Sequence, residues 1–293
     1  MDSTSIYSHV HGRYSATARS GAVGDHVKNV AQAFGYSAEE LASIPSDSNL
    51  GLSCGNPLAL ASLKQGETVV DLGCGAGFDV FLAAKKLGMT GKAIGVDMNE
   101  DMLAKARANA SRAQIDNVTF IWSRITSIDL PDHSADVVIS NCVINLVPDD
   151  EKHLVFKEMH RMLKPGGRVA VSDILTKKPL PEDMKQNVAL YVGCVAGASS
   201  RGEYEMWLQQ AGFEDVAIVN AGSDLNVYTS GGVDPECCPG EEDKKPVEEV
   251  KQSCCGGKQE QDGGVMADMR RDWSSLDLNE WAGSYKIFAI KKS

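Results

Sequence analysis

The sequence lacks the long apolar stretches that membrane and secreted proteins carry. No segment approaches the roughly 18 to 20 consecutive apolar residues of a membrane-spanning helix. The beginning of the chain, MDSTSIYSHVHGRYS, contains no apolar run of the kind found in signal peptides. We therefore expect a cytoplasmic protein that has no membrane partner.

Basic residues are scarce relative to acidic ones. The chain has 29 Lys and Arg against 40 Asp and Glu, which gives a formal net charge of −11. Such an acidic chain is poorly suited to binding phosphate backbones, and the sequence has no basic patch interleaved with aromatic residues. We expect a monomer that binds no nucleic acid.

Familiar catalytic and zinc-binding patterns are missing as well. The 6 histidines occur singly or on expected helix faces, and no His or Glu motif of a general base is evident. The adjacent cysteines at 237–238 and 254–255 differ from the CxxC pairs of structural zinc sites. Because intracellular thiols are kept reduced, we expect the 8 cysteines to act as ligands, nucleophiles or packing groups rather than in disulfides.

What the sequence does have is an alternation of short apolar strands and amphipathic helices, which begins near residue 67. Before it, residues 1–36 are only weakly patterned, and short helices are expected at 37–44 and 57–63. The alternation predicts an α/β fold with a parallel, doubly wound sheet. Strands are expected at 68–73, 91–98, 117–123, 136–140, 168–174, 215–221 and 281–292, and longer helices at 77–87, 100–110, 149–163 and 201–213.

A glycine-rich turn, LGCGAGFDV at residues 72–80, follows the first expected strand. Its glycines remove side chains, so that the backbone can approach a bound nucleotide cofactor; they are Gly73, Gly75 and Gly77. The second expected strand reaches Asp97, where a carboxylate can accept hydrogen bonds from both ribose hydroxyls. These features predict a nucleotide-cofactor site, and so far they fit NAD as well as S-adenosylmethionine.

Two details favour S-adenosylmethionine. Asp71, directly before the turn, would repel a pyrophosphate but suits a cationic ammonium or sulfonium group. The glycine spacing is G-x-G-x-G, whereas dinucleotide sites have G-x-G-x-x-G with a helix N-terminus that opens onto phosphate. Cys74, inside the turn, is interpreted as a small packing side chain beside the cofactor rather than a substrate ligand.

The motifs VVDLGCGAG, GVDM and MLKPGGRVAVSD together resemble those of class I S-adenosylmethionine methyltransferases over roughly residues 66–175. The resemblance implies a Rossmann-like methyltransferase sheet with S-adenosylmethionine as cofactor. The predicted cofactor-binding residues are Asp71, Gly73, Gly75, Gly77, Asp97, Met98, Ile125 and Asn141.

Three cysteines stand in loops near the expected cofactor site. Cys54 lies in LSCGNP before the first strand, Cys142 in SNCVINLVPD after the fourth, and Cys194 in YVGCVAGAS after the fifth. Loops that follow the fourth and fifth strands of a doubly wound sheet face the reactive end of the cofactor. Spacing alone does not show that these cysteines meet, and a buried cysteine is often only a small apolar side chain.

The segments around these cysteines, together with LNEWAGSYKIFAIKK at the end, resemble arsenite S-adenosylmethionine methyltransferases from about residue 47 onward. The resemblance implies methylation of arsenite, free or as a thiol complex, with As(III) held by the thiolates of Cys54, Cys142 and Cys194. As(III) is a soft ion that prefers thiolates, and three of them leave its lone pair free to attack the methyl group. A thiol reductant, glutathione or thioredoxin, is the implied co-substrate.

The chain departs from this family in one respect. Many members carry a further cysteine near the N-terminus, whereas residues 1–53 contain none. The remaining cysteines are candidates for a redox relay or for arsenite capture; they are Cys237, Cys238, Cys254 and Cys255. They lie in a stretch rich in Gly, Pro and charge, which predicts a mobile linker.

The resemblance also suggests a division of the chain into four parts. Residues 1–175 form the cofactor-binding domain with an N-terminal extension, and 176–230 form an arsenic-binding region. Residues 231–264 are the cysteine-containing linker, and 265–293 a C-terminal segment.

Two other functions fit parts of the sequence. A class I methyltransferase for a small carbon or oxygen nucleophile, such as a quinone or sterol, would have an apolar pocket and a general base, with the cysteines as packing. A thiol-rich protein that sequesters metalloids would bind arsenite without consuming S-adenosylmethionine.

Overall fold

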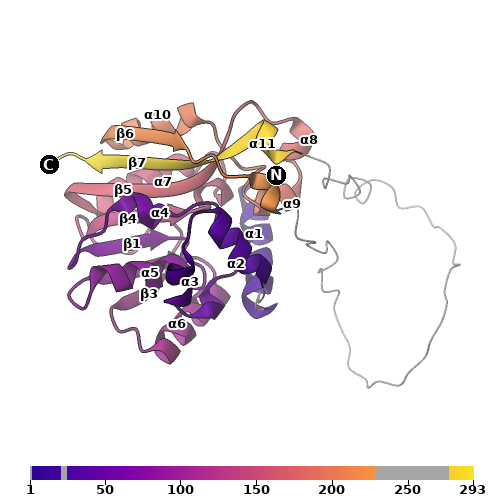
Figure 1. The fold of residues 1–293 in the computed structure, drawn as a ribbon. Coiled ribbons are helices and arrows are strands. Elements are labelled where there is room, and N and C mark those ends of the chain that lie inside the picture. The colour runs from indigo at the N-terminus through magenta and orange to yellow at the C-terminus, as the bar shows by residue number, and fades with distance from the viewer. Residues whose placement is uncertain (1, 21–24, 229–276) are drawn as a thin grey trace, which may run out of the picture.

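The computed structural model describes residues 2–20, 25–228 and 277–293. In these residues a seven-stranded sheet has the order β3-β2-β1-β4-β5-β7-β6, and helices cover it (Figure 1). The predicted linker 231–264 and its four cysteines lie outside the described residues. The strands are β1 (Thr68–Leu72), β2 (Lys92–Asp97), β3 (Val118–Trp122), β4 (Ala135–Asn141), β5 (Leu163–Thr176), β6 (Phe213–Asn220) and β7 (Ala282–Lys291).

The first five strands run parallel to one another, as the alternating pattern predicts. β7 inserts between β5 and β6 and is antiparallel to both, so that the C-terminal strand runs through the middle of one half of the sheet. The apolar pattern of 281–292 predicts a strand there, but a strand pattern carries no information about direction. The α/β fold with a Rossmann-like sheet is confirmed, with this one antiparallel strand added.

Helices lie on both faces of the sheet because successive strand residues point to opposite sides. Val69 packs with α4 (Pro57–Ala61), α5 (Phe78–Leu87) and α6 (Glu100–Ala113) on one face. Val70 packs with α7 (Lys152–Met162) and α10 (Arg201–Ala211) on the other. The other helical segments of the described residues are α1 (Ser3–Ser20), α2 (Asp25–Ala33), α3 (Ala38–Ala42), η1 (Ser46–Ser48), η2 (Ile144–Leu146), α8 (Glu182–Lys185), α9 (Val188–Val192), η3 (Leu225–Tyr228) and α11 (Leu278–Trp281).

The N-terminal segment is more ordered than its weak pattern predicts. It forms α1 (Ser3–Ser20), which contacts α6 and α9, followed by α2. Of the helix only Ile6, Val10, Ser15 and Ala18 are buried, so it has no broad apolar stripe. Its stability therefore comes from packing against the rest of the protein rather than from a strong helical pattern.

Local signals for helix ends are confirmed where the sequence predicts them. Ser37 and Glu40 form a reciprocal capping box at α3, and Ser200 and Glu203 form one at α10. Asn56 caps α4. In the described part of the chain, no helix is both long and apolar enough to cross a membrane.

Candidate active site

The glycine-rich turn between β1 and α5 has a backbone that other residues rarely adopt. Gly73, Gly75 and Gly77 have φ angles of 68°, 51° and 91°. A Cβ atom on Gly73 would lie 2.4 Å from Cγ2 of Val143, so the close approach also requires glycine there. The turn is anchored because the amides of Gly73 and Cys74 both donate to the Val96 carbonyl, at 2.7 and 3.0 Å.

Asp97 holds the turn from the end of β2. Its carboxylate accepts hydrogen bonds from the amides of Gly75, at 2.9 Å, and Asn99, at 2.8 Å. Burial raises the pKa of Asp97 above its ordinary value, while these backbone bonds act in the opposite direction. The predicted ribose-binding residue is thus also a structural contact of the turn.

A single pocket collects the predicted cofactor-binding residues. All of them except Gly77 line it: Asp71, Gly73, Gly75, Asp97, Met98, Ile125 and Asn141. Gly77, the last glycine of the turn, faces α5 instead, and a Cβ atom on it would be 2.7 Å from the Phe81 ring. The side chains of α1 line the pocket as well, including Val10 and Tyr14. Sequence analysis missed this contribution because α1 itself was not predicted.

The pocket is lined by three carboxyl groups, of which Asp71 and Asp79 are buried and Asp97 is partly exposed. Burial raises the pKa of Asp71, and the neighbouring charges of Asp79 and Asp97 raise it further. Burial also raises the pKa of Asp79, to about 6. Each ionised carboxylate is therefore energetically unfavourable here, and a cationic ligand would relieve this cost.

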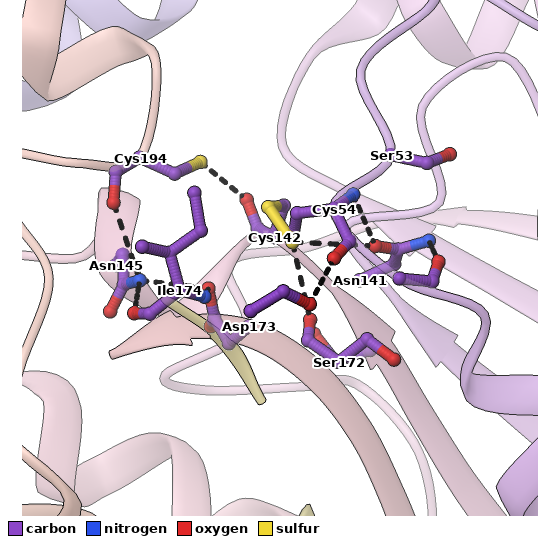
Figure 2. The surroundings of a disulfide bond; sticks show 12 residues. Ser53, Cys54, Asn141, Cys142, Asn145, Ser172, Asp173, Ile174 and Cys194 are labelled. Carbon is purple, nitrogen blue, oxygen red and sulfur yellow. Dashed lines mark hydrogen bonds between the residues drawn. A yellow bond between two sulfur atoms is a disulfide. The ribbon is translucent and has the colours of Figure 1, made fainter. Parts of the chain in front are cut away.

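Asn141 connects the pocket to the loop that carries Cys54. Its amide nitrogen donates to Asp79 and to the Gly55 carbonyl, both at 2.9 Å, and to the Tyr36 hydroxyl at 2.9 Å. Its amide oxygen accepts from the Cys54 amide at 3.2 Å (Figure 2). One side chain at the end of β4 thus holds both regions in place.

The three predicted arsenic ligands lie together (Figure 2). Cys54 and Cys142 form a disulfide with a Cα–Cα distance of 5.8 Å, and the Cys194 thiol donates to the Cys142 carbonyl at 2.8 Å. Cys142 lines the pocket. The expectation that the cysteines are not paired in disulfides is therefore wrong for Cys54 and Cys142, because two loops that are distant in sequence bring both sulfurs together in a buried position.

Two of these cysteines have unusual backbone conformations. Cys142 and Cys194 adopt the left-handed region, with φ angles of 58° and 66°. Residues other than glycine rarely do so, and such conformations persist only where many contacts enforce them, most often at functional sites. Cys74, by contrast, packs in the apolar cluster beside Gly95, in agreement with its predicted packing role.

Asp173, which sequence analysis did not single out, lies next to the disulfide. A carboxylate oxygen of Asp173 and the sulfurs of Cys54 and Cys142 lie within 4.8 Å of one another. Burial raises the pKa of Asp173 to about 7, while a hydrogen bond from the Tyr204 hydroxyl at 2.8 Å favours the charged form. Burial likewise raises the pKa of the Cys194 thiol.

The Cys54 loop is fixed by the C-terminal part of the chain. The Ser284 hydroxyl, on β7, donates to the Cys54 carbonyl at 2.6 Å, and the Tyr228 hydroxyl donates to the Ser53 carbonyl at 2.6 Å. No local sequence signal indicates these contacts, since they depend on the position that β7 takes in the sheet. The site is therefore assembled from both ends of the sequence.

Comparison with known proteins identifies relatives of the chain. The family model described as "Methyltransferase domain" matches residues 63–212. A Halobacterium salinarum protein named arsenite methyltransferase is 48% identical over 184 residues, which are 63% of this chain and 46% of the relative. An Aquipseudomonas alcaligenes protein of the same name is 39% identical over 173 residues, 57% of this chain and 49% of the relative.

The fold also matches a solved structure, an arsenic(III) S-adenosylmethionine methyltransferase from Chlamydomonas reinhardtii. That match has a TM-score of 0.53 and 25% identity, and it covers 93% of this chain and 75% of the other. The chain spans about half the length of the curated relatives it matches. The predicted resemblance to arsenite methyltransferases is thus confirmed as a similarity of sequence and fold.

Proposed function

Since the chain belongs to the methyltransferase-domain family, we propose that it transfers methyl groups from S-adenosylmethionine to trivalent arsenic. One observation carries the proposal. Cys142 lines the same pocket as Asp97 and the glycine turn, with Cys54 and Cys194 in contact behind it. In this proposal the arsenic site and the cofactor site adjoin at Cys142.

The pocket has the chemistry that S-adenosylmethionine requires. The cofactor carries a sulfonium and an ammonium group, and the buried carboxyls of Asp71 and Asp79 favour a cation. Asp97 provides acceptors for the ribose hydroxyls. When bound, S-adenosylmethionine supplies an electrophilic methyl group, so the residues of the chain need mainly to align the nucleophile.

Arsenic binding requires the reduced form of the site. When the Cys54–Cys142 disulfide is reduced, the two sulfurs and that of Cys194 provide three thiolates for the soft As(III) ion. Three ligands on one side leave the arsenic lone pair on the opposite side. No general base is needed, because the attacking atom carries no proton.

The electron balance explains why a thiol reductant is needed. The arsenic lone pair forms the new As–C bond, while the methyl–sulfur bond breaks and leaves its electron pair on the cofactor sulfur. Arsenic is thereby oxidised by two electrons. Two thiolates return those electrons when they leave as a disulfide, and Cys54 and Cys142 are a pair that can do so. Glutathione or thioredoxin would then reduce this disulfide for the next cycle.

The products would be mono- and dimethylated arsenicals, and the biological role would be detoxification of arsenic in the cytoplasm. A monomethylated arsenical already has one ligand position occupied by carbon. It therefore needs only two protein thiolates, those of Cys142 and Cys194, and in the second methylation these two would leave as the disulfide that returns the electrons to arsenic.

The direct test is to incubate the reduced protein with arsenite, glutathione and S-adenosylmethionine and to identify the arsenic species by mass spectrometry. Methylated arsenic in excess over protein supports the proposal. Bound arsenite without methylation would instead indicate a sequestering protein. Methylation of a quinone but not of arsenite would indicate a methyltransferase for carbon or oxygen nucleophiles.

A further inference from the structure

Asn145 joins the two loops that carry Cys142 and Cys194. It lies in η2, three residues after Cys142, and its side chain is fully buried. Its amide nitrogen donates to the carbonyl of Ile174 at 2.6 Å, to the carboxylate of Asp173 at 2.8 Å, and to the carbonyl of Cys194 at 3.4 Å (Figure 2). A single amide group thus contacts the end of β5 and the Cys194 loop.

The two loops also fit closely along their backbones. A Cβ atom on Gly197 would lie 2.1 Å from the Asn145 carbonyl oxygen, so only glycine allows this approach. The buried Lys152 ammonium donates to the Gly197 carbonyl at 2.5 Å and to the Ser199 hydroxyl at 3.0 Å. These contacts hold the far end of the loop, while Asn145 holds its beginning at Cys194.

Cys194 is consequently held on both sides. Its thiol donates to the Cys142 carbonyl at 2.8 Å, and its own carbonyl accepts from Asn145. The left-handed backbone of Cys194, with φ of 66°, is unfavourable for a residue other than glycine and needs such contacts to persist. The bond from Asn145 therefore acts on a residue whose backbone conformation is unfavourable by itself.

We propose that Asn145 is a positioning residue that fixes Cys194 relative to Cys142, so that both sulfurs can bind one arsenic atom. The inference rests on the proposed arsenic site and adds a residue outside its ligand set. Asn145 does not line the cofactor pocket. Its loss should therefore weaken arsenic binding and leave cofactor binding unchanged.

Two variants test this role in the reduced protein. Asn145→Ala removes the amide, and Asn145→Ser keeps a polar group that is too short to reach Cys194. Each should raise the dissociation constant for arsenite about tenfold, as expected for the loss of a buried hydrogen bond worth about 1.4 kcal/mol. The dissociation constant for S-adenosylmethionine should change less than about twofold, which would also show that the variant is folded.

The matched control is Asn117→Ala. Asn117 also donates its amide to two backbone carbonyls, those of Ala84 and Gly88, but it precedes β3 and takes no part in the pocket. This variant should lose thermal stability without any change in arsenite affinity. A purely structural role of Asn145 would give the same pattern as this control.

X-ray absorption at the arsenic edge supplies the decisive signature. Wild-type protein with arsenite should show three sulfur neighbours, and the Asn145 variants two sulfurs and one oxygen. Three sulfurs in both variants, with unchanged affinity, would overturn the positioning role and leave the proposed function standing. Fewer than three sulfurs in the wild type would overturn both.

Discussion

The two sides of the pocket are built in different ways. On the cofactor side, the turn after β1 is held by hydrogen bonds from its own backbone amides to the Val96 carbonyl and to the Asp97 carboxylate at the end of β2. On the cysteine side, the loops of Cys54, Cys142 and Cys194 are held by side chains from distant elements, including Asn141, Asn145 and Ser284. The turn on the first side thus depends on contacts between two adjacent strands, whereas the second side depends on contacts between elements that are far apart in the sequence.

This difference implies that the two sides can be disrupted separately. A change on the cysteine side should alter arsenic binding while cofactor affinity stays the same, and a change on the cofactor side should do the reverse. Asn141 is the exception, because it contacts both Asp79 and Cys54. The predictions below examine this separation, beginning with the largest expected effect.

Cys142→Ser should abolish methylation of arsenite. The variant replaces a soft sulfur ligand by a hard hydroxyl, and we expect a loss of more than about 100-fold, beyond what an outer contact of a metal site costs. Cofactor affinity should change little, because the serine hydroxyl still fits the pocket wall. Calorimetry with S-adenosylmethionine measures the cofactor affinity, and speciation of arsenic by mass spectrometry measures the methylation. Near-normal methylation would remove Cys142 from the ligand set.

Asp97→Asn should weaken cofactor binding by roughly 10- to 100-fold, since charge-assisted hydrogen bonds contribute about 1.5–3 kcal/mol. Arsenite affinity of the reduced protein should remain that of the wild type. The control is Asp101→Asn, which removes an exposed ion pair with Arg19 and should change neither affinity. Equal loss of arsenite and cofactor binding in Asp97→Asn would contradict the separation of the two sides.

Cofactor affinity should fall as the pH decreases from 7 to 5. Burial raises the pKa of Asp79 in the cofactor-free protein from 3.8 to about 6. Below about pH 6 the protonated carboxyl therefore stabilises the cofactor-free folded state, and this contribution is lost as the pH rises through about 6. A cationic cofactor favours the ionised carboxylate, so its binding releases a proton. We expect a change of at most about tenfold per pH unit, the limit for one proton.

The Asp79→Asn variant provides the comparison for this pH effect. It keeps the size of the side chain and removes the titrating group, so its cofactor affinity should depend less on pH. Calorimetry in two buffers of different ionisation enthalpy measures the proton release directly. If the pH slope is the same in wild type and variant, Asp79 is not responsible for it.

The smallest effect is expected for Ser37→Ala, which removes the cap of α3. Loss of such a cap costs about 1 kcal/mol, which lowers the melting temperature by about 2 °C in a protein of this size. Both binding affinities should stay unchanged, because the cap lies outside the pocket. Thermal unfolding followed by circular dichroism provides the measurement.

The local construction of the cofactor side also explains why it could be predicted. The apolar runs of β1 and β2 and the glycine turn are each specified within a few residues. The same holds for the helix caps outside the pocket, at Ser37, Asn56 and Ser200. The helix α1 escaped prediction because most of its residues are polar and it is stabilised by contacts with α6 and α9. The direction of β7 likewise depends on its neighbours in the sheet.

The cysteine side could be identified only through resemblance to a family. Periodicity and spacing place Cys54, Cys142 and Cys194 in separate loops, and nothing in them indicates that the sulfurs meet. Asn145 lies in the segment SNCVINLVPD, but its proposed role depends on a hydrogen bond to Cys194, which is 49 positions away in the sequence. The sequence pattern indicates only that Asp173 lies near the end of a strand, and its position beside the disulfide follows from the fold.

A single-turnover experiment tests the central claim most directly. Fully reduced protein, in excess over arsenite, is mixed with methyl-labelled S-adenosylmethionine in the absence of any added thiol. We expect one labelled methyl group on each bound arsenic atom and the loss of two free thiols, recovered as the Cys54–Cys142 disulfide in peptide mass spectrometry. Unmethylated arsenic with all three thiols still free would contradict the account.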